Sequence, residues 1–182
     1  MQLNKAKDNP DDKEKFALNG ATRLPENEFD QTKKLILLVD DSKNDATLLM
    51  LEFGRVGLAN PVVWLRDGSE AISYLSGDGK YQDREAYPVP SIVLLDLNMP
   101  NVDGFGVLRW IGTQPELKRL LVIVLSGVED VKKVNKAYEL GANSYLTKPT
   151  NRHDLSNLVE FFRGYWIITN RTPEVPQIRS RA

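Results

Sequence analysis

The stretch Ser91-Ile92-Val93-Leu94-Leu95 is almost wholly apolar, and an acid, Asp96, follows it directly. A run this short, with apolar residues pointing to both faces, is typical of a strand buried on both sides of a parallel sheet. Comparable apolar runs occupy 35–39, 61–65, 121–125 and 144–146. The sequence therefore predicts a parallel sheet of five strands.

Helical patterns separate these runs. Ser42 is followed three residues later by Asp45, and Asp67 by Glu70, which is the spacing of a helix-capping box. Gly141 can end the helix that precedes the last strand. Alternating strands and helices predict an α/β fold with a doubly wound, five-stranded parallel sheet of the flavodoxin-like type. We expect its strand order to be 2-1-3-4-5.

The two ends of the chain differ from this central part. Residues 1–33 are rich in Lys, Asp, Glu and Asn and have no sustained apolar period. Such a segment cannot bury enough apolar surface to offset its ordering entropy. We therefore expect 1–33 to be a mobile N-terminal extension, 34–169 to form the folded domain, and 170–182 to be a C-terminal tail.

Composition limits the function classes. The chain has 182 residues, a net charge of -1 and no Cys. The charge argues against binding to nucleic acid or to an anionic membrane surface, and the lack of Cys excludes disulfides and thiolate chemistry. No apolar run approaches the roughly 20 residues that span a bilayer. We expect a cytoplasmic protein with no membrane partner.

Polar residues follow the strands where each one ends. Asp40 and Asp41 follow the first strand, Asp96 the third, Ser126 the fourth and Lys148 the fifth. In such sheets the ligand binds at the carboxyl ends of the strands, so we expect these side chains to converge. Crowded carboxylates need a cation, and an oxygen-rich site suits Mg²⁺. A lysine, a hydroxyl donor and a carboxylate nucleophile beside Mg²⁺ predict phosphoryl-transfer chemistry.

Four motifs together resemble the receiver domain of bacterial response regulators, from about residue 34 to residue 169. They are Val39-Asp40-Asp41-Ser42, Leu94-Leu95-Asp96-Leu97-Asn98-Met99-Pro100 with Asp103-Gly104, Leu125-Ser126-Gly127, and Gly141-Ala142-Asn143-Ser144-Tyr145-Leu146-Thr147-Lys148-Pro149. The resemblance implies that Asp96 accepts a phosphoryl group from a partner histidine kinase. The domain then signals by protein–protein interaction, and its only catalysis is its own phosphorylation and dephosphorylation.

The resemblance also implies a role for each neighbour of Asp96. Asp41, Asp96 and the backbone carbonyl of Asn98 would bind Mg²⁺, and Asp40 would act through a bound water. Lys148 would pair with Asp96 and then with the phosphoryl group, and the bond before Pro149 would be cis. Ser126 and Tyr145 would form the switch, which would move the face made by the fourth helix, the fifth strand and the fifth helix.

Other features are similar to those of phytochrome-associated response regulators. These are the long segment 76–90, the Leu-Asn-Met-Pro turn at 97–100 and the aromatic residues of the last helix. We accordingly expect a phytochrome-type histidine kinase as partner, and a homodimer through the face defined above. About 12 residues remain after 170, which indicates a stand-alone receiver without an output domain.

Simpler interpretations compete with these. Asp40 and Asp41 could be ordinary acids at a helix start, and Ser126 could cap the fourth helix. His153 is the only histidine; we interpret it as a surface residue rather than a phosphate acceptor. An aspartate-nucleophile phosphatase of similar fold is the alternative function, but it would want an acid two residues after the nucleophile, where Asn98 stands.

Overall fold

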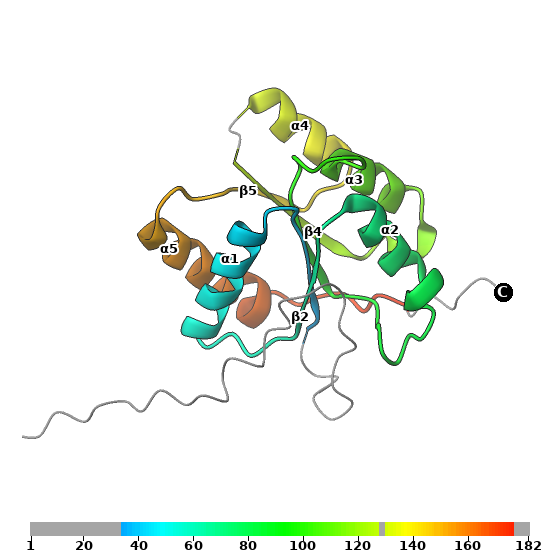
Figure 1. The fold of residues 1–182 in the computed structure, drawn as a ribbon, viewed down its shortest axis with the longest axis horizontal. Helices are drawn as coiled ribbons and strands as arrows, with labels where there is room; N and C mark the ends of the chain where they lie inside the picture. The colour runs from blue at the N-terminus through cyan, green and yellow to red at the C-terminus, as the bar shows by residue number, and fades with distance from the viewer. Residues whose placement is uncertain (1–33, 128–129, 177–182) are drawn as a thin grey trace, which may run out of the picture.

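The sheet lies at the centre of the fold, with helices on both of its faces (Figure 1). The computed structural model describes residues 34–127 and 130–176. All strands pair in parallel in the order β2-β1-β3-β4-β5, so the predicted fold class and strand order are confirmed. The strands are β1 (Ile36–Val39), β2 (Val62–Leu65), β3 (Ile92–Leu95), β4 (Leu121–Ser126) and β5 (Ser144–Thr147).

Two hydrophobic layers hold the helices to the sheet. On one face, α1 (Lys43–Arg55) and α5 (Arg152–Phe162) pack over the cluster that contains Ile36 and Leu38. On the other face, Leu37 and Val39 belong to the cluster covered by the remaining helices. β1 and β3 are apolar throughout because both of their faces are buried, whereas β5, at the edge of the sheet, contains Ser144 and Thr147 and is only partly buried. The helices of the second face are α2 (Gly68–Ser76), α3 (Gly104–Gly112) and α4 (Val131–Glu139).

Side-chain caps set where the helices begin. The Ser42 hydroxyl accepts a hydrogen bond from the Asp45 N–H, and the Asp67 carboxylate accepts one from the Ser69 N–H, as the capping spacing predicts. Asp130 caps α4, so Ser126 does not. Gly141 follows α4 with a φ of 97°, a left-handed conformation that glycine adopts without strain.

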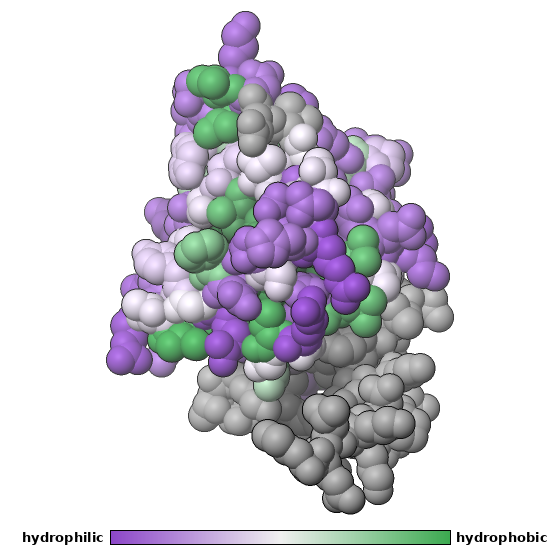
Figure 2. Space-filling view, turned by 90° about the vertical axis from the view of Figure 1, so that its left-hand side faces the viewer, coloured by the Kyte–Doolittle hydropathy of each residue, from purple (hydrophilic) through white to green (hydrophobic). Residues whose placement is uncertain are grey.

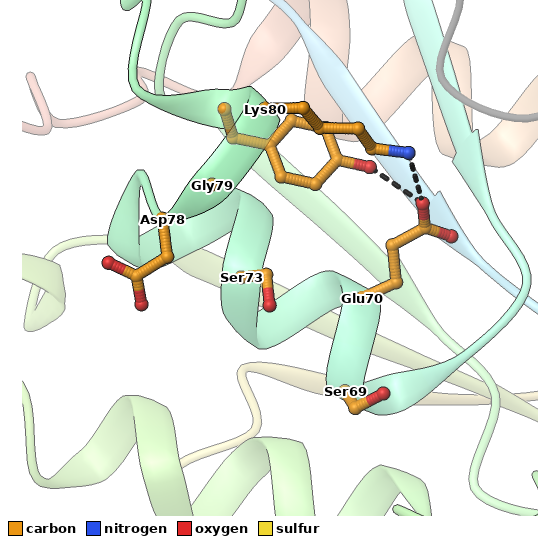
Figure 3. A pocket seen from close by; sticks show the side chains of 7 residues that line it. Ser69, Glu70, Ser73, Asp78, Gly79 and Lys80 are labelled. Atoms are coloured by element: carbon orange, nitrogen blue, oxygen red, sulfur yellow. Dashed lines mark hydrogen bonds and ion pairs between the residues drawn. The ribbon is translucent and has the colours of Figure 1, made fainter.

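The long connection between α2 and β3 is packed against the domain. It contains the single turn η2 (Gly79–Tyr81), and Tyr74, Tyr81 and Tyr87 contact one another through their rings. Figure 3 shows Glu70 of α2 accepting hydrogen bonds from Lys80 and Tyr81, each at 2.8 Å. The aromatic residues thus fix the path that leads into β3.

The C-terminal helix changes its winding and closes the domain. After α5 the chain continues as a π-helical segment, η4 (Arg163–Thr169). The Lys34 ammonium, just before β1, donates to the carbonyls of Trp166, Ile167 and Asn170 at 3.0–3.2 Å. The chain then crosses the lower half of the fold in Figure 1, and Val175 packs against the core of the α2–α4 face.

The predicted extension 1–33, residues 128–129 and residues 177–182 of the predicted tail lie outside the described residues. None of the helices that the structure describes combines the length and apolar character needed to cross a bilayer.

Candidate functional site

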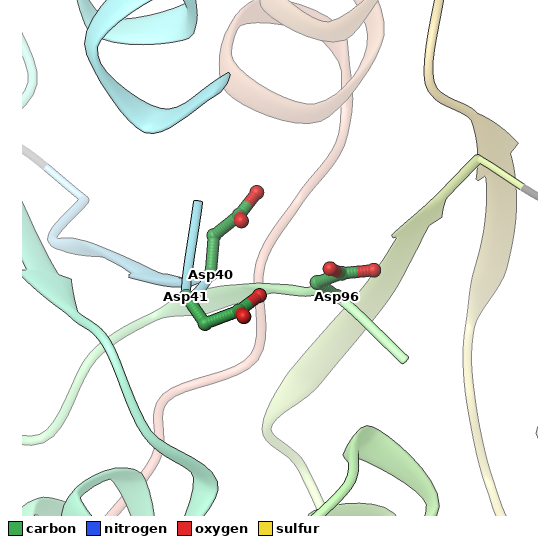
Figure 4. Close-up of side chains that lie close together, drawn as sticks. All are labelled: Asp40, Asp41 and Asp96. Atoms are coloured by element: carbon green, nitrogen blue, oxygen red, sulfur yellow. The ribbon is translucent and has the colours of Figure 1, made fainter. Parts of the chain in front are cut away.

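Three aspartates meet at the carboxyl edge of the sheet, where β1 and β3 end side by side (Figure 4). One carboxylate oxygen from each of Asp40, Asp41 and Asp96 lies within 4.8 Å of the other two. Asp40 is 2% exposed and Asp96 is 6% exposed, whereas Asp41 is half-buried. Three oxygen donors at this spacing, with one side open to water, can hold a divalent cation.

Lys148 supplies positive charge to this cluster from the end of β5. Its ammonium lies 2.8 Å from the carboxylate of Asp40 and 3.2 Å from each of the carboxylates of Asp96 and Asp45. The Lys148 backbone N–H donates to the Ser126 carbonyl at 2.9 Å. Pairing between β4 and β5 therefore positions the lysine beside acids that precede it by more than fifty positions in the sequence.

Burial and ion pairing shape the protonation of the site. Burial disfavours the charged form of Asp40, and it outweighs the hydrogen bond from Lys148, so the pKa of Asp40 is raised. Burial also opposes the charge on Lys148, but the contacts with Asp40 and Asp96 outweigh it and raise the pKa of this lysine. One cation is thus held firmly among acids that outnumber it, which leaves the cluster negative and attractive to a metal ion.

The turn after β3 packs closely around Asp96. The Asn98 backbone N–H donates to the Asp96 carboxylate at 3.3 Å, and the Asn98 amide donates to the Ser126 hydroxyl at 3.3 Å. A Cβ on Gly104 would overlap the Asp96 carbonyl, so only glycine allows α3 to begin this close to the site. The Asp103-Gly104 pair therefore allows α3 to begin close to Asp96, with Asp103 as its N-cap.

The predicted switch residues lie on adjacent strands. Ser126 is fully buried at the end of β4. Tyr145 on β5 is half-buried and packs against the core of the α2–α4 face, and its backbone N–H donates to the Tyr138 hydroxyl of α4 at 3.2 Å. These contacts link the site edge to α4.

Some outcomes differ from expectation. The bond before Pro149 is trans, as are all peptide bonds of the described residues, so the implied cis bond is wrong for this structure; trans is the ordinary form of such a bond. Asp40 serves two purposes, because it also accepts the Ser42 backbone N–H at 2.9 Å. His153, by contrast, is exposed in the first turn of α5, where it contacts Asn157, which agrees with its interpretation as a surface residue.

Three residues of the site were not predicted from the sequence. Asp45 pairs with Lys148, and its capping position on the first helix was the one available signal. The Trp64 indole donates to the Asp40 carbonyl at 2.9 Å, and Lys133 of α4 donates to the Asn98 amide oxygen at 3.2 Å. Both contacts join residues far apart in the chain, so no local pattern reports them. The pocket of about 410 Å³ between α2 and η2 includes none of these residues.

Comparison with known proteins agrees with this geometry. Residues 36–160 match the response regulator receiver domain family. The response regulator Rcp1 of Synechocystis is 39% identical over 140 residues, covering 77% of this chain and 93% of Rcp1. Its Mn²⁺-bound crystal structure superposes with a TM-score of 0.71 at 38% identity, covering 78% of this chain and 99% of that one.

Two further solved structures are similar over the same part of the chain. The phosphorylated cyanobacterial phytochrome response regulator RcpA has a TM-score of 0.73 at 36% identity, covering 78% of this chain and 99% of its own. RPA3017, a response regulator in red light signalling of R. palustris, has a TM-score of 0.73 at 33% identity, with the same coverage. The chain belongs to the response regulator receiver domain family of two-component signalling, and it is similar to the phytochrome response regulators of that family.

Proposed function

We propose that this receiver takes a phosphoryl group from a histidine kinase onto Asp96, with Mg²⁺ bound beside it. One observation carries the proposal: Asp40, Asp41 and Asp96 lie within 4.8 Å of one another, with the Lys148 ammonium 3.2 Å from Asp96. The Mn²⁺-bound form of Rcp1 supports a divalent cation in this setting. Mg²⁺ is the hard, oxygen-preferring cation that bridges carboxylates to phosphate.

The surroundings of each aspartate favour Asp96 as the acceptor. The two oxygens of Asp40 are held by the Ser42 N–H at 2.9 Å and by Lys148 at 2.8 Å, which are shorter contacts than those at 3.2–3.3 Å on the two oxygens of Asp96. Asp96 lies beside groups that can stabilise a phosphoryl group. It contacts the Lys148 ammonium and the Asn98 backbone N–H, and the Asn98 side chain in turn donates to the Ser126 hydroxyl. Asp41 is left more exposed, where it can hold the metal ion together with Asp96 and the Asn98 carbonyl, while Asp40 acts through water.

The transfer itself is a displacement at phosphorus. An oxygen of Asp96 forms a bond to the phosphorus of the phosphohistidine as the P–N bond breaks and the imidazole leaves. Lys148 stabilises the charge on the phosphoryl oxygens, and the Ser126 hydroxyl donates a hydrogen bond to one of them. Mg²⁺ held by Asp41, Asp96 and the Asn98 carbonyl would offset the remaining negative charge. Tyr145 follows Ser126 inward, which alters the face of α4, β5 and α5.

That face is the proposed surface for signalling and for a homodimer. Large apolar side chains are exposed there: Val131 and Tyr138 on α4, and Phe161 and Tyr165 on α5 with the following segment. Two of these residues, Phe161 and Tyr165, line a groove of about 450 Å³ together with Leu146, Leu158, Phe162 and Trp166. Figure 2 views the side of the molecule where α1 and α5 lie and shows apolar side chains in patches among hydrophilic ones.

The proposal includes the partner of the protein, its cellular location and the bounds of its domain. Similarity to RcpA and Rcp1 supports a phytochrome-type histidine kinase as the partner, in the cytoplasm where such relays exchange phosphate. Residues 34–169 form the receiver, flanked by 1–33 and 170–182, with no nucleic-acid contact. Family membership favours this reading over the aspartate-nucleophile phosphatase, since Asn98 cannot act as a general acid.

The test is labelling by acetyl phosphate with Mg²⁺, followed by intact-protein mass spectrometry. The unchanged chain should gain one phosphoryl group, Asp96→Asn should gain none, and Asp78→Asn, at an exposed acid outside the cluster, should label normally. Addition of a chelator should abolish labelling. Labelling of Asp96→Asn at the normal rate would contradict the assignment of the acceptor.

A further inference from the structure

Lys133 of α4 contacts the turn that covers the proposed acceptor. Its ammonium donates to the Asn98 amide oxygen at 3.2 Å, and the amide nitrogen of the same side chain donates to the Ser126 hydroxyl at 3.3 Å. The Asn98 backbone N–H meanwhile donates to Asp96. One exposed asparagine is therefore held at three points, by the acceptor, by the end of β4 and by α4.

The contact between Lys133 and Asn98 joins a charged ammonium to a neutral amide. Within the part of the chain that the structure describes, no carboxylate lies within ion-pair distance of Lys133. Its partner there is a neutral amide, although a lysine on an open helix face is free to turn toward water. One turn further along α4, the Lys136 ammonium lies 4.3 Å from the centre of the Phe105 ring of α3. The two lysines share the α4 face that points toward α3 and the Asp96 turn.

We infer that Lys133 is a positioning residue that sets how long the phosphoryl group stays on Asp96. The inference rests on the proposed function and acts through Asn98. In hydrolysis, a water oxygen forms a bond to phosphorus while the bond from phosphorus to the Asp96 oxygen breaks. Inorganic phosphate leaves with both protons of the water, and the carboxylate is restored. An asparagine held from both ends restricts the approach of that water.

Phosphorylation should strengthen this restraint. The phosphoryl group adds negative charge next to Asn98, and Lys133 is the lysine of α4 whose ammonium already contacts Asn98. Attraction between unlike charges falls slowly with distance in a partly buried site. The cation should therefore draw α4 and Asn98 toward the phosphorylated acceptor, and its removal should release both.

The experiment compares the phosphoryl half-lives of variants after labelling with acetyl phosphate and Mg²⁺ and removal of the donor. Lys133→Gln should lose the phosphoryl group about three-fold faster, which is the size of effect that one hydrogen bond contributes. Lys132→Gln makes the same charge change at the neighbouring exposed residue and should keep the normal half-life. Lys133→Arg should restore most of the lifetime, because arginine can donate to the same amide oxygen.

A second comparison separates positioning from direct electrostatics. If Lys133 acts through Asn98, then Asn98→Ala and the Asn98→Ala/Lys133→Gln double variant should have the same half-life. An unchanged or longer half-life for Lys133→Gln, or full additivity in the double variant, would overturn the inference while leaving Asp96 as the acceptor. Failure of the unchanged chain to label at all would instead reject the proposed function.

Discussion

The ammonium of Lys148 lies 3.2 Å from a carboxylate oxygen of Asp96, and this contact joins the ends of β5 and β3 across β4. The same ammonium is 2.8 Å from Asp40, whose side chain is almost fully buried. Lys148 therefore has a structural role before any phosphoryl group arrives, because it compensates acids that would otherwise face one another unpaired.

Replacement of Lys148 by Met should lower the free energy of unfolding by about 1–3 kcal/mol in the presence of a chelator, since buried carboxylates lose their partner. Mg²⁺ should restore a large part of that loss, because a bound cation replaces the missing charge. Urea unfolding with chelator and with Mg²⁺ measures both effects. Lys118→Met, at an exposed lysine, is the control, and an equal loss in both variants would contradict the structural role.

Trp64 should report metal binding directly. Its indole donates to the Asp40 carbonyl, and the ring is 6% exposed, next to the acidic cluster. In a Trp110→Phe/Trp166→Phe background, Mg²⁺ should change the fluorescence of Trp64 in a saturable way. Asp41→Asn should weaken the apparent affinity by about tenfold or more, because it removes a charged ligand. Equal affinity in both proteins would show that Asp41 does not bind the ion.

Lys34 should stabilise the C-terminal end of the domain. Burial lowers the pKa of this lysine, and nearby Arg171 lowers it further, yet its ammonium caps three carbonyls of the last helical segment. Lys34→Met should lower the free energy of unfolding by about 1–2 kcal/mol. Hydrogen exchange should rise first in η4 if the cap acts locally. Uniformly raised exchange would contradict a local role.

The α2–η2 contact should make part of the stability depend on pH. Partial burial favours the neutral form of Glu70, but hydrogen bonds from Lys80 and Tyr81 outweigh it and lower the pKa of this acid. The resulting stabilisation is complete above the ordinary glutamate pKa of about 4.3 and is lost as the pH falls through the lower folded-state value.

Glu70→Gln should therefore be less stable than the unchanged chain at neutral pH, and the difference should shrink in acid. Urea unfolding along a pH series measures this difference, and Glu85→Gln, at an exposed acid of the same connection, is the matched control. A difference that stays constant across the series would exclude a contribution from the charge of Glu70.

Association through the face of α4, β5 and α5 should depend on its exposed apolar side chains. In the presence of beryllofluoride and Mg²⁺, which mimic the phosphoryl group, we expect the mass in solution to rise toward that of a dimer. Val131→Ser with Phe161→Ser should weaken this association by about tenfold or more. Leu51→Ser removes another exposed apolar side chain, from α1, and should have no effect. Loss of association in that control would place the contact elsewhere.

The sequence alone determined the elements of this protein. The strand β3 spans Ile92–Leu95 in the structure, since a short apolar run closed by an acid favours a strand buried on both faces. Ser42 and Asp67 cap the helices that their spacing predicts, because a cap is a contact between residues three or fewer positions apart. Alternation of strands and helices then limits the topology to very few arrangements.

Only the tertiary structure decided which polar groups touch. Lys148 contacts the carboxylates of Asp40, Asp45 and Asp96. Lys133 of α4 donates to the Asn98 side chain. Lys34 donates to the Trp166 carbonyl in the last helical segment. Each contact depends on the rotation and depth of a whole helix or strand against the sheet. The packed core sets these positions through the summed fit of many apolar side chains, and no short stretch of sequence contains that information.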